Sequence, residues 1–183
     1  MFNRDFNELL SIFNDYKVKY LVVGGYAVGF HAQPRATKDL DLFIEPDPDN
    51  GKAVYTALAK FGAPLAGLTP DDFMERGAFF RMGHPPLMVE IFPDIKGVDF
   101  DRAWEKRVET TVDPDTGLKA FLISRDDLIA AKLATGRPQD LADVAALRKA
   151  AESQGPHPAR KKPRNRNRRT CLKPVTGVAQ QDR

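Results

Sequence analysis

Hydrophobic residues at helical and then strand spacing mark out the first part of the chain. Residues 5–16 place hydrophobic side chains three or four positions apart, which predicts an amphipathic helix. A short apolar run at residues 20–23 ends at Gly24-Gly25 and indicates a buried strand followed by a turn. A second helix is then expected over residues 26–32.

The next segments have mainly the spacing of strands. Residues 38–45 alternate charged and apolar side chains, a pattern typical of a strand with one buried face. A turn rich in Pro and Asp is predicted at residues 46–51, and a helix over residues 52–61. Residues 79–82 and 87–92 are predicted to be two strands on either side of a turn that contains Gly and Pro.

The last segments predict a short helix, two strands and two further helices. The short helix is expected over residues 102–107, and a turn at residues 113–117 with a strand on either side. Ser124 is a good N-cap for a helix over residues 126–135. A last helix is expected over residues 138–151, because proline suits the first helical position.

The composition is that of a soluble globular protein. Of the 183 residues, 42% are hydrophobic and 29% are charged, which excludes a wholly disordered chain. No apolar run approaches the roughly 18 residues needed to span a bilayer, and the first residues lack the apolar stretch of a secretory signal. The single cysteine, Cys171, excludes an internal disulfide and a cysteine-built zinc site. These features favour a reducing, cytoplasmic location and no membrane partner.

Charge divides the chain into two parts. Residues 151–183 contain nine Lys or Arg and two acidic residues, a net charge of +7, whereas residues 1–150 carry −4. Residues 1–152 are predicted to form one domain, large enough to bury a core. Residues 153–183 have no apolar period and are predicted to be a basic, disordered tail. The tail is either a solvated extension or a segment that contacts RNA phosphates nonspecifically.

Two carboxylates lie two positions apart on the strand predicted over residues 38–45. Side chains at alternate positions share one face of a strand, so Asp39 and Asp41 point the same way while Leu40 and Leu42 point into the core. Neighbouring carboxylates repel each other unless a cation offsets their charge, and oxygen ligands of this kind suit Mg²⁺. The alternative is a solvated strand face that carries two surface acids.

Gly24-Gly25 and Glu90 add to this pair. A diglycine between a strand and a helix allows a ligand to approach closely, and free N–H groups at a helix start favour phosphate; a tight turn without a ligand is the alternative. Glu90 is the single charged residue in the apolar strand at residues 87–92. If the two strands are neighbours, three carboxylates can hold one or two Mg²⁺ ions for phosphoryl transfer. If Glu90 instead faces solvent, only the pair remains.

Together these segments resemble the signature of the DNA polymerase beta-like nucleotidyltransferase superfamily. That signature consists of a hydrophobic residue with Gly-Gly or Gly-Ser, a spacer, Asp-x-Asp or Asp-x-Glu between hydrophobic residues, and a later acid in a strand. The matching segments here are Val23-Gly24-Gly25, Asp39-Leu40-Asp41-Leu42 and Val89-Glu90-Ile91. The fuller string over residues 24–42 is similar to small bacterial nucleotidyltransferases grouped with AbiEii-type toxins and related antitoxin-system enzymes. The resemblance covers most of residues 5–150.

The resemblance implies an α+β fold in which helices flank a mixed sheet, with a pair of helices at the C-terminal end of the domain. It implies that a nucleoside triphosphate and one or two Mg²⁺ ions bind at the edge of the sheet. Asp39 and Asp41 would be metal ligands. Glu90 would be the third catalytic acid, as a metal ligand or as the group that activates the acceptor hydroxyl.

The same resemblance assigns further residues to the nucleotide. Gly24 and Gly25 would approach the phosphates. The later segment with Lys132, Gly136-Arg137, Asp140 and Asp143 is similar to C-terminal elements of AbiEii-like enzymes, and Lys132 would contact a phosphate or the nucleotide. Arg35 precedes the acidic strand and would meet a phosphate through its guanidinium group, although an Arg in a surface loop is equally consistent with its position. The alternative for Lys132 and Asp140 is an ion pair between the last two helices.

The predicted reaction transfers a nucleoside monophosphate from an NTP to an acceptor hydroxyl and releases pyrophosphate. The resemblance implies as acceptor a protein side chain, the 3′ end of a tRNA or a small molecule. It also includes toxin–antitoxin systems, so a cognate toxin or antitoxin is among the predicted partners. Two alternatives stay open: a catalytically silent nucleotide-sensing or partner-binding module of the same fold, and RNA binding through the basic tail.

Overall fold

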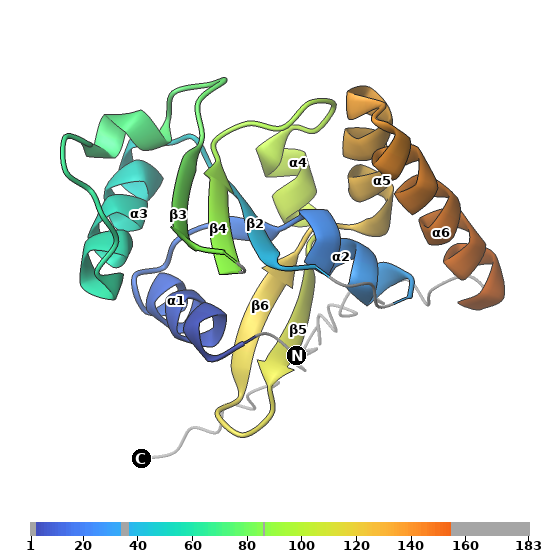
Figure 1. Cartoon of the computed structure of the whole chain (residues 1–183), viewed down its shortest axis with the longest axis horizontal. Helices are drawn as coiled ribbons and strands as arrows, with labels where there is room; N and C mark the ends of the chain where they lie inside the picture. Colours follow the sequence, from blue (N-terminus) through green and yellow to red (C-terminus); the bar gives the residue numbers. More distant parts are fainter. Residues whose placement is uncertain (1–2, 34–36, 86, 155–183) are drawn as a thin grey trace, which may run out of the picture.

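The computed structural model of the chain describes residues 3–33, 37–85 and 87–154. The strands are β1 (Tyr20–Val22), β2 (Asp39–Ile44), β3 (Phe80–His84), β4 (Leu87–Phe92), β5 (Val108–Asp113) and β6 (Leu118–Leu122). They form one mixed sheet in the order β3-β4-β2-β1-β6-β5 (Figure 1). β2 runs parallel to β4 and β1 runs parallel to β6, whereas the other neighbouring pairs are antiparallel.

Helices surround this sheet. They are α1 (Arg4–Asp15), α2 (Gly24–His31), α3 (Pro48–Phe61), α4 (Phe100–Glu105), α5 (Arg125–Thr135) and α6 (Pro138–Gln154), with a short 3-10 helix, η1 (Pro70–Phe73). Figure 1 shows α3 at one end of the molecule and the pair formed by α5 and α6 at the other. The predicted α+β fold, with helices around a mixed sheet and a C-terminal helical pair, is confirmed.

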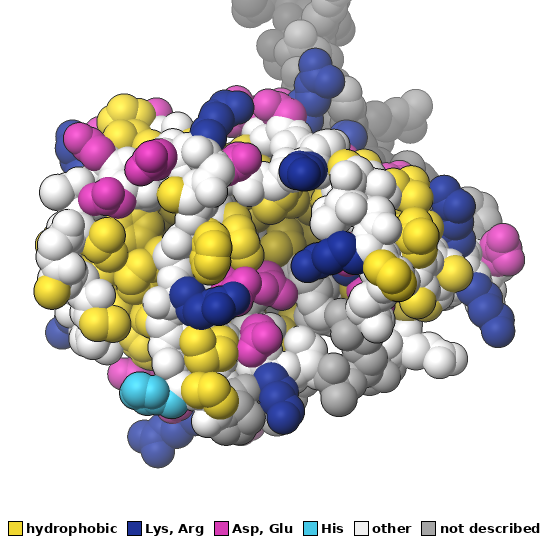
Figure 2. Space-filling view, turned by 45° about the horizontal axis from the view of Figure 1, so that its top comes forward, with side chains coloured by type: hydrophobic (Ala, Val, Ile, Leu, Met, Phe, Trp, Pro, Cys, Tyr) yellow, Lys and Arg dark blue, Asp and Glu magenta, His cyan; other side chains and the backbone are white. Residues whose placement is uncertain are grey.

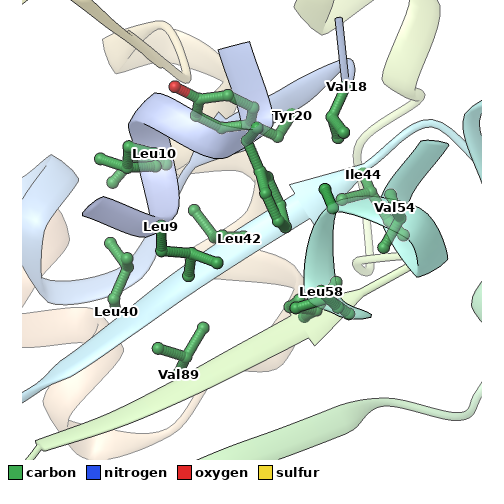
Figure 3. Close-up of a cluster of buried hydrophobic side chains, with 14 of the residues drawn as sticks. Leu9, Leu10, Val18, Tyr20, Leu40, Leu42, Ile44, Val54, Leu58 and Val89 are labelled. Carbon is green, nitrogen blue, oxygen red and sulfur yellow. The ribbon is translucent and has the colours of Figure 1, made fainter. Parts of the chain in front are cut away.

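One face of the sheet packs against α1 and α3. Leu40 and Leu42 of β2 point to this face and are fully buried, together with Leu9 of α1 and Leu58 of α3 (Figure 3). Burying one such side chain contributes about 1.5–3 kcal/mol relative to leaving it exposed. Because strand side chains alternate, this packing fixes which residues of β2 face the other way.

The opposite face packs against α2, α4, α5 and α6 over a second hydrophobic cluster. Phe43 of β2 lies in this cluster, so Asp39 and Asp41 share its face. Asp39 is exposed and Asp41 is half-buried, which leaves the beginning of β2 open to solvent. The predicted orientation of the two acids, opposite to the core side chains Leu40 and Leu42, is confirmed.

Some boundaries differ from the sequence prediction. α3 begins at Pro48, inside the predicted turn, because the Asp47 carboxylate accepts hydrogen bonds from backbone N–H groups of the first helical turn. α6 continues to Gln154, past its predicted end at Ala151, and no pattern in the sequence predicts η1. Ser124 caps α5 as predicted, by accepting a hydrogen bond from the backbone of the first turn.

The predicted basic tail begins at residue 153, but residues 153 and 154 belong to α6, and residues 155–183 lie outside the described residues. Within the described ranges, none of the helices combines the length and the apolar character that crossing a membrane requires.

Candidate active site

A row of charged side chains crosses three adjacent strands. In the parallel pair of β2 and β4, Asp41 lies opposite Glu90, and in the antiparallel pair of β3 and β4, Arg81 lies opposite Glu90. Asp39 precedes Asp41 by two positions and therefore shares its face. The adjacency on which the predicted group of three acids depends is thus present, with Arg81 as a fourth member that the sequence prediction did not contain.

The turn at Gly24 brings the start of α2 against Asp41. Gly24 has a φ of +59°, and a Cβ atom added there would lie 1.8 Å from Asp41 Oδ2. The backbone N–H of Val23 donates to the Asp41 carbonyl at 2.9 Å, and the N–H of Gly25 donates to the Asp41 carboxylate. At least one N–H group predicted to be free for phosphate is therefore used to hold a carboxylate.

Burial and charge repulsion both act on Asp41. Burial, followed by the neighbouring charges of Glu90 and Asp39, raises the pKa of the Asp41 carboxyl from 3.8 to about 6. The hydrogen bond from Gly25 and the positive charge of Lys132 offset only part of this rise. The carboxylates are close enough to repel one another, and a cation among them would relieve that repulsion. Carboxylate oxygens are the type of ligand that Mg²⁺ prefers, so the chemistry of these side chains fits this ion.

Glu90 is bound by a cation of the protein itself. The guanidinium group of Arg81 donates to Glu90 Oε1, and the side chains of these residues are 53% and 17% exposed, respectively. Among the described residues, no group of three or more His, Cys, Asp or Glu side chains lies close enough to hold a metal ion. Glu90 would have to leave Arg81 and turn toward Asp41 before it could share a metal ion with Asp39 and Asp41.

Lys132 of α5 is buried between two carboxylates of α6. Its Nζ atom lies 3.0 Å from Asp140 Oδ1 and 2.7 Å from Asp143 Oδ2, and all three side chains are less than 10% exposed. Arg137 donates from Nε to Asp140 Oδ2 at 2.7 Å. The alternative interpretation of Lys132 and Asp140 as an ion pair between the last two helices is present in the structure, and Asp143 is a further partner of this lysine.

Burial and hydrogen bonding shift the pKa of Asp140 in opposite directions. Burial acts to raise the pKa of its carboxyl, but hydrogen bonds from Arg137 and Lys132 outweigh burial, so that the pKa lies below its usual value. Asp140 is therefore ionised at neutral pH and keeps both cations in place. Arg137, whose side chain is 72% exposed, extends from this pair toward solvent.

Replacing Lys132 by Met is expected to lower the free energy of unfolding by about 3–5 kcal/mol, because it removes the cation that Asp140 and Asp143 share while both carboxylates stay buried. Urea unfolding monitored by circular dichroism measures this loss. Lys119→Met is the matched control, since Lys119 pairs with Glu109 on the surface and such pairs contribute about 0–1 kcal/mol. Equal effects of the two substitutions would contradict a structural role for Lys132.

A cleft of about 650 Å³ connects the charged row with the α5–α6 pair. Its lining includes the acids Asp39, Asp41 and Glu90, the cations Arg81, Lys96, Lys132 and Arg137, and the aromatic residues Phe79 and Phe92. Figure 2 shows acidic side chains gathered near the middle of this side of the molecule, with Lys or Arg side chains on either side of them. A cleft with acids at its base and cations beside them has the charges needed for a metal-bound polyphosphate.

The sequence profile of one protein family, described as a nucleotidyltransferase of unknown function (DUF6036), matches residues 2–151. The chain belongs to this nucleotidyltransferase family. The match does not reach the AbiEii-type subgroup, which stays a prediction. No curated protein matches the chain.

Two solved structures are similar to this member of the nucleotidyltransferase family. An antigenic nucleotidyltransferase-like protein from Paracoccidioides brasiliensis is 17% identical, with a TM-score of 0.48 and coverage of 79% of this chain and 74% of that chain. The lincosamide antibiotic adenylyltransferase LnuA, bound to lincomycin, is 14% identical, with a TM-score of 0.48 and coverage of 82% of this chain and 99% of that chain.

The remaining predicted residues differ in what the structure says of them. Arg35, predicted to meet a phosphate, lies outside the described residues. His31 of α2 is buried, and its Nε2 atom lies 2.7 Å from the Ile123 carbonyl oxygen. Sequence analysis did not single out Arg81 or Phe79; their spacing of two would have placed them on one strand face, but not beside Glu90.

Proposed function

We propose that this family member is a Mg²⁺-dependent nucleotidyltransferase that moves a nucleoside monophosphate from an NTP to a hydroxyl acceptor. The observation that carries the proposal is the register of β2 and β4, which puts Asp41 opposite Glu90 at the base of a cleft that Gly24 also lines. The family assignment supports nucleotidyl transfer in general. The metal dependence and the roles of single residues belong to the proposal.

In this proposal Asp39 and Asp41 hold the metal ion and Glu90 completes the acidic site. Bound Mg²⁺ would offset the charge of the triphosphate and polarise the α-phosphate. Glu90, once released from Arg81, accepts the proton of the acceptor hydroxyl. The hydroxyl oxygen forms a bond to the α-phosphorus, and the bond from that phosphorus to pyrophosphate breaks.

The cations of the cleft would stabilise the leaving pyrophosphate. Arg137 is exposed and lines the same cleft as Asp41. The positive charge of Lys132 acts on Asp41, while the ammonium group itself stays bound by Asp140 and Asp143. Its predicted contact with a phosphate remains part of this proposal, as do the nucleotide contacts assigned to Gly24, Gly25, Arg35 and Asp140.

The finer assignments made from the sequence stay predictions. A protein side chain or a tRNA 3′ end as acceptor, a toxin–antitoxin partner and a cytoplasmic location all extend the family assignment beyond nucleotidyl transfer. One observation favours a catalytically silent module of the same fold: Glu90 is held by Arg81. That reading predicts nucleotide binding without transfer.

Labelled nucleotides separate the two functions. The protein is incubated with Mg²⁺, a cell lysate or total tRNA, and each NTP labelled either at the α- or at the γ-phosphate. Nucleotidyl transfer leaves α-label on the acceptor and releases γ-label as pyrophosphate, and excess EDTA stops both. Binding of NTP without α-label transfer to any acceptor would support the silent module, and transfer of γ-label to the acceptor would contradict the proposed reaction.

A further inference from the structure

The cleft has two walls of different chemistry. The wall formed by α5 and the start of α6 includes the exposed Arg137 and the buried ion pair of Lys132 with Asp140, and we call it the basic wall. The wall at β3, β4 and the residues that follow β4 includes Phe79, Phe92 and Ile95 together with the cations Arg81 and Lys96, and we call it the aromatic wall. The row of carboxylates lies between the two, so the walls would meet different parts of the reacting molecules.

Phe79 is an exposed ring held in a defined position. Its exposed fraction of 52% is the largest among the big hydrophobic side chains of the described residues. The ring stacks on Phe92, with centroids 5.7 Å apart and planes 26° apart, and the Arg81 guanidinium carbon lies 5.3 Å from its centroid. Stacking on one side thus fixes a ring that remains half open to the cleft.

The aromatic wall begins two residues after Glu90 along β4. Phe92 follows Glu90 by two positions on β4, so the two side chains share a face and are separated by about 7 Å along the strand. A hydroxyl oxygen that gives its proton to Glu90 could therefore belong to a group whose ring reaches Phe79. The triphosphate, with its negative charge, would be drawn instead to the exposed Arg137 of the basic wall and to the N-terminus of α2.

We propose that Phe79, supported by Phe92, is the binding platform for a planar aromatic ring of the acceptor, which would be a phenol or a similar aromatic alcohol. This proposal rests on the proposed function and adds the chemical class of its acceptor. Ring-on-ring stacking favours an aromatic acceptor over a saturated one of the same size, because offset π-systems attract beyond the effect of area.

The test compares p-cresol with trans-4-methylcyclohexanol, which have the same size and hydroxyl position but differ in the aromatic ring. Their affinities are measured by ligand-observed NMR with the full chain, Mg²⁺ and the α,β-methylene analogue of ATP. Wild-type protein should bind p-cresol about five- to tenfold more tightly than its saturated counterpart. Phe79→Leu should remove this preference, and Phe79→Tyr should keep it. Phe30→Leu is the matched control, because Phe30 is 45% exposed on α2 and does not line the cleft.

Equal binding of the two alcohols by the wild type would overturn the proposal, as would a preference that survives in Phe79→Leu. A loss of affinity for the ATP analogue in Phe79→Leu, without a change for p-cresol, would assign the platform to the nucleobase and also overturn it. Binding is measured without turnover, so the binding result does not require that the protein transfers a nucleotide. If Asp41→Asn and the wild type both fail to transfer label while the aromatic preference persists, the reaction is wrong but the platform stands.

Discussion

Replacing Asp41 by Asn is expected to abolish nucleotidyl transfer and, at the same time, to make the folded chain more stable. Asn keeps an oxygen for the Gly25 N–H but loses the charge that a metal ion needs. Since metal stabilisation of a transition state amounts to several kcal/mol, the rate should fall by at least about a thousandfold. The α-label assay measures this loss, and an unchanged rate would contradict the role of Asp41.

The gain in stability follows from the pKa of Asp41. This pKa rises from 3.8 to about 6 on folding, so between these pH values the folded chain binds more protons than the unfolded chain. The free energy of unfolding therefore falls as pH rises through this window. Asp41→Asn has no carboxyl group to ionise at this position, so its stability does not fall in this way. It should be more stable than the wild type by about 1–3 kcal/mol at pH 8, and by little at pH 4.

Urea unfolding at the two pH values, without divalent ions, checks this expectation. Glu8→Gln is the control, because Glu8 is exposed on α1 and its replacement should change stability by less than about 0.5 kcal/mol. A destabilised Asp41→Asn at pH 8 would mean that burial and the neighbouring acids do not disfavour the ionised form of Asp41. Mg²⁺ with nucleotide should reverse the order, because it stabilises only a chain that binds it.

The second large effect is expected for Gly24→Ala. The added Cβ atom would overlap Asp41 Oδ2 at 1.8 Å and would also sit on a backbone with φ of +59°. The left-handed backbone costs roughly 1–2 kcal/mol for a residue other than glycine, and the overlap adds about 1–3 kcal/mol or displaces Asp41. A displacement near 1 Å in a reacting group can cost about a hundredfold in rate.

Gly62→Ala separates the two causes. Gly62 has a φ of +87°, and nothing lies within 4 Å of the Cβ that alanine would add, so this variant bears only the backbone cost. Urea unfolding and the α-label assay are run on both variants. Gly24→Ala should lose more stability than Gly62→Ala and should be the one that loses transfer. Equal stabilities and rates would show that Gly24 does not make room for Asp41.

Sequence alternation predicted the acids of β2 because local geometry alone decides their orientation. Leu40 and Leu42 must be buried, so Asp39 and Asp41 face away from them. The alternation of residues within β2 does not determine which strand pairs with it. The residue opposite Asp41 comes from a strand separated from β2 along the chain by α3, η1 and β3, and only the folded sheet establishes that it is Glu90.

The partners of charged side chains were harder to predict than the strands. The pairing of Glu90 with Arg81 depends on the register of the β3–β4 hairpin, and Gly25 reaches Asp41 only because α2 begins against β2. Lys132 binds two acids of α6, Asp140 and Asp143, whereas the ion pair predicted from the sequence included only Asp140. Such contacts depend on distances between elements, which hydrophobic periodicity does not contain.

Binding of Mn²⁺ as a spectroscopic substitute for Mg²⁺ tests most directly whether the acids of β2 hold a divalent ion. Electron paramagnetic resonance counts the ions bound in the presence of the α,β-methylene analogue of ATP, in the wild type and in the double variant Asp39→Asn/Asp41→Asn. The wild type is expected to bind one or two Mn²⁺ ions per chain. In the double variant, the protein should bind no Mn²⁺ beyond the ion that the nucleotide analogue itself chelates. Equal Mn²⁺ binding by both proteins would contradict the metal site and, with it, the proposed transferase.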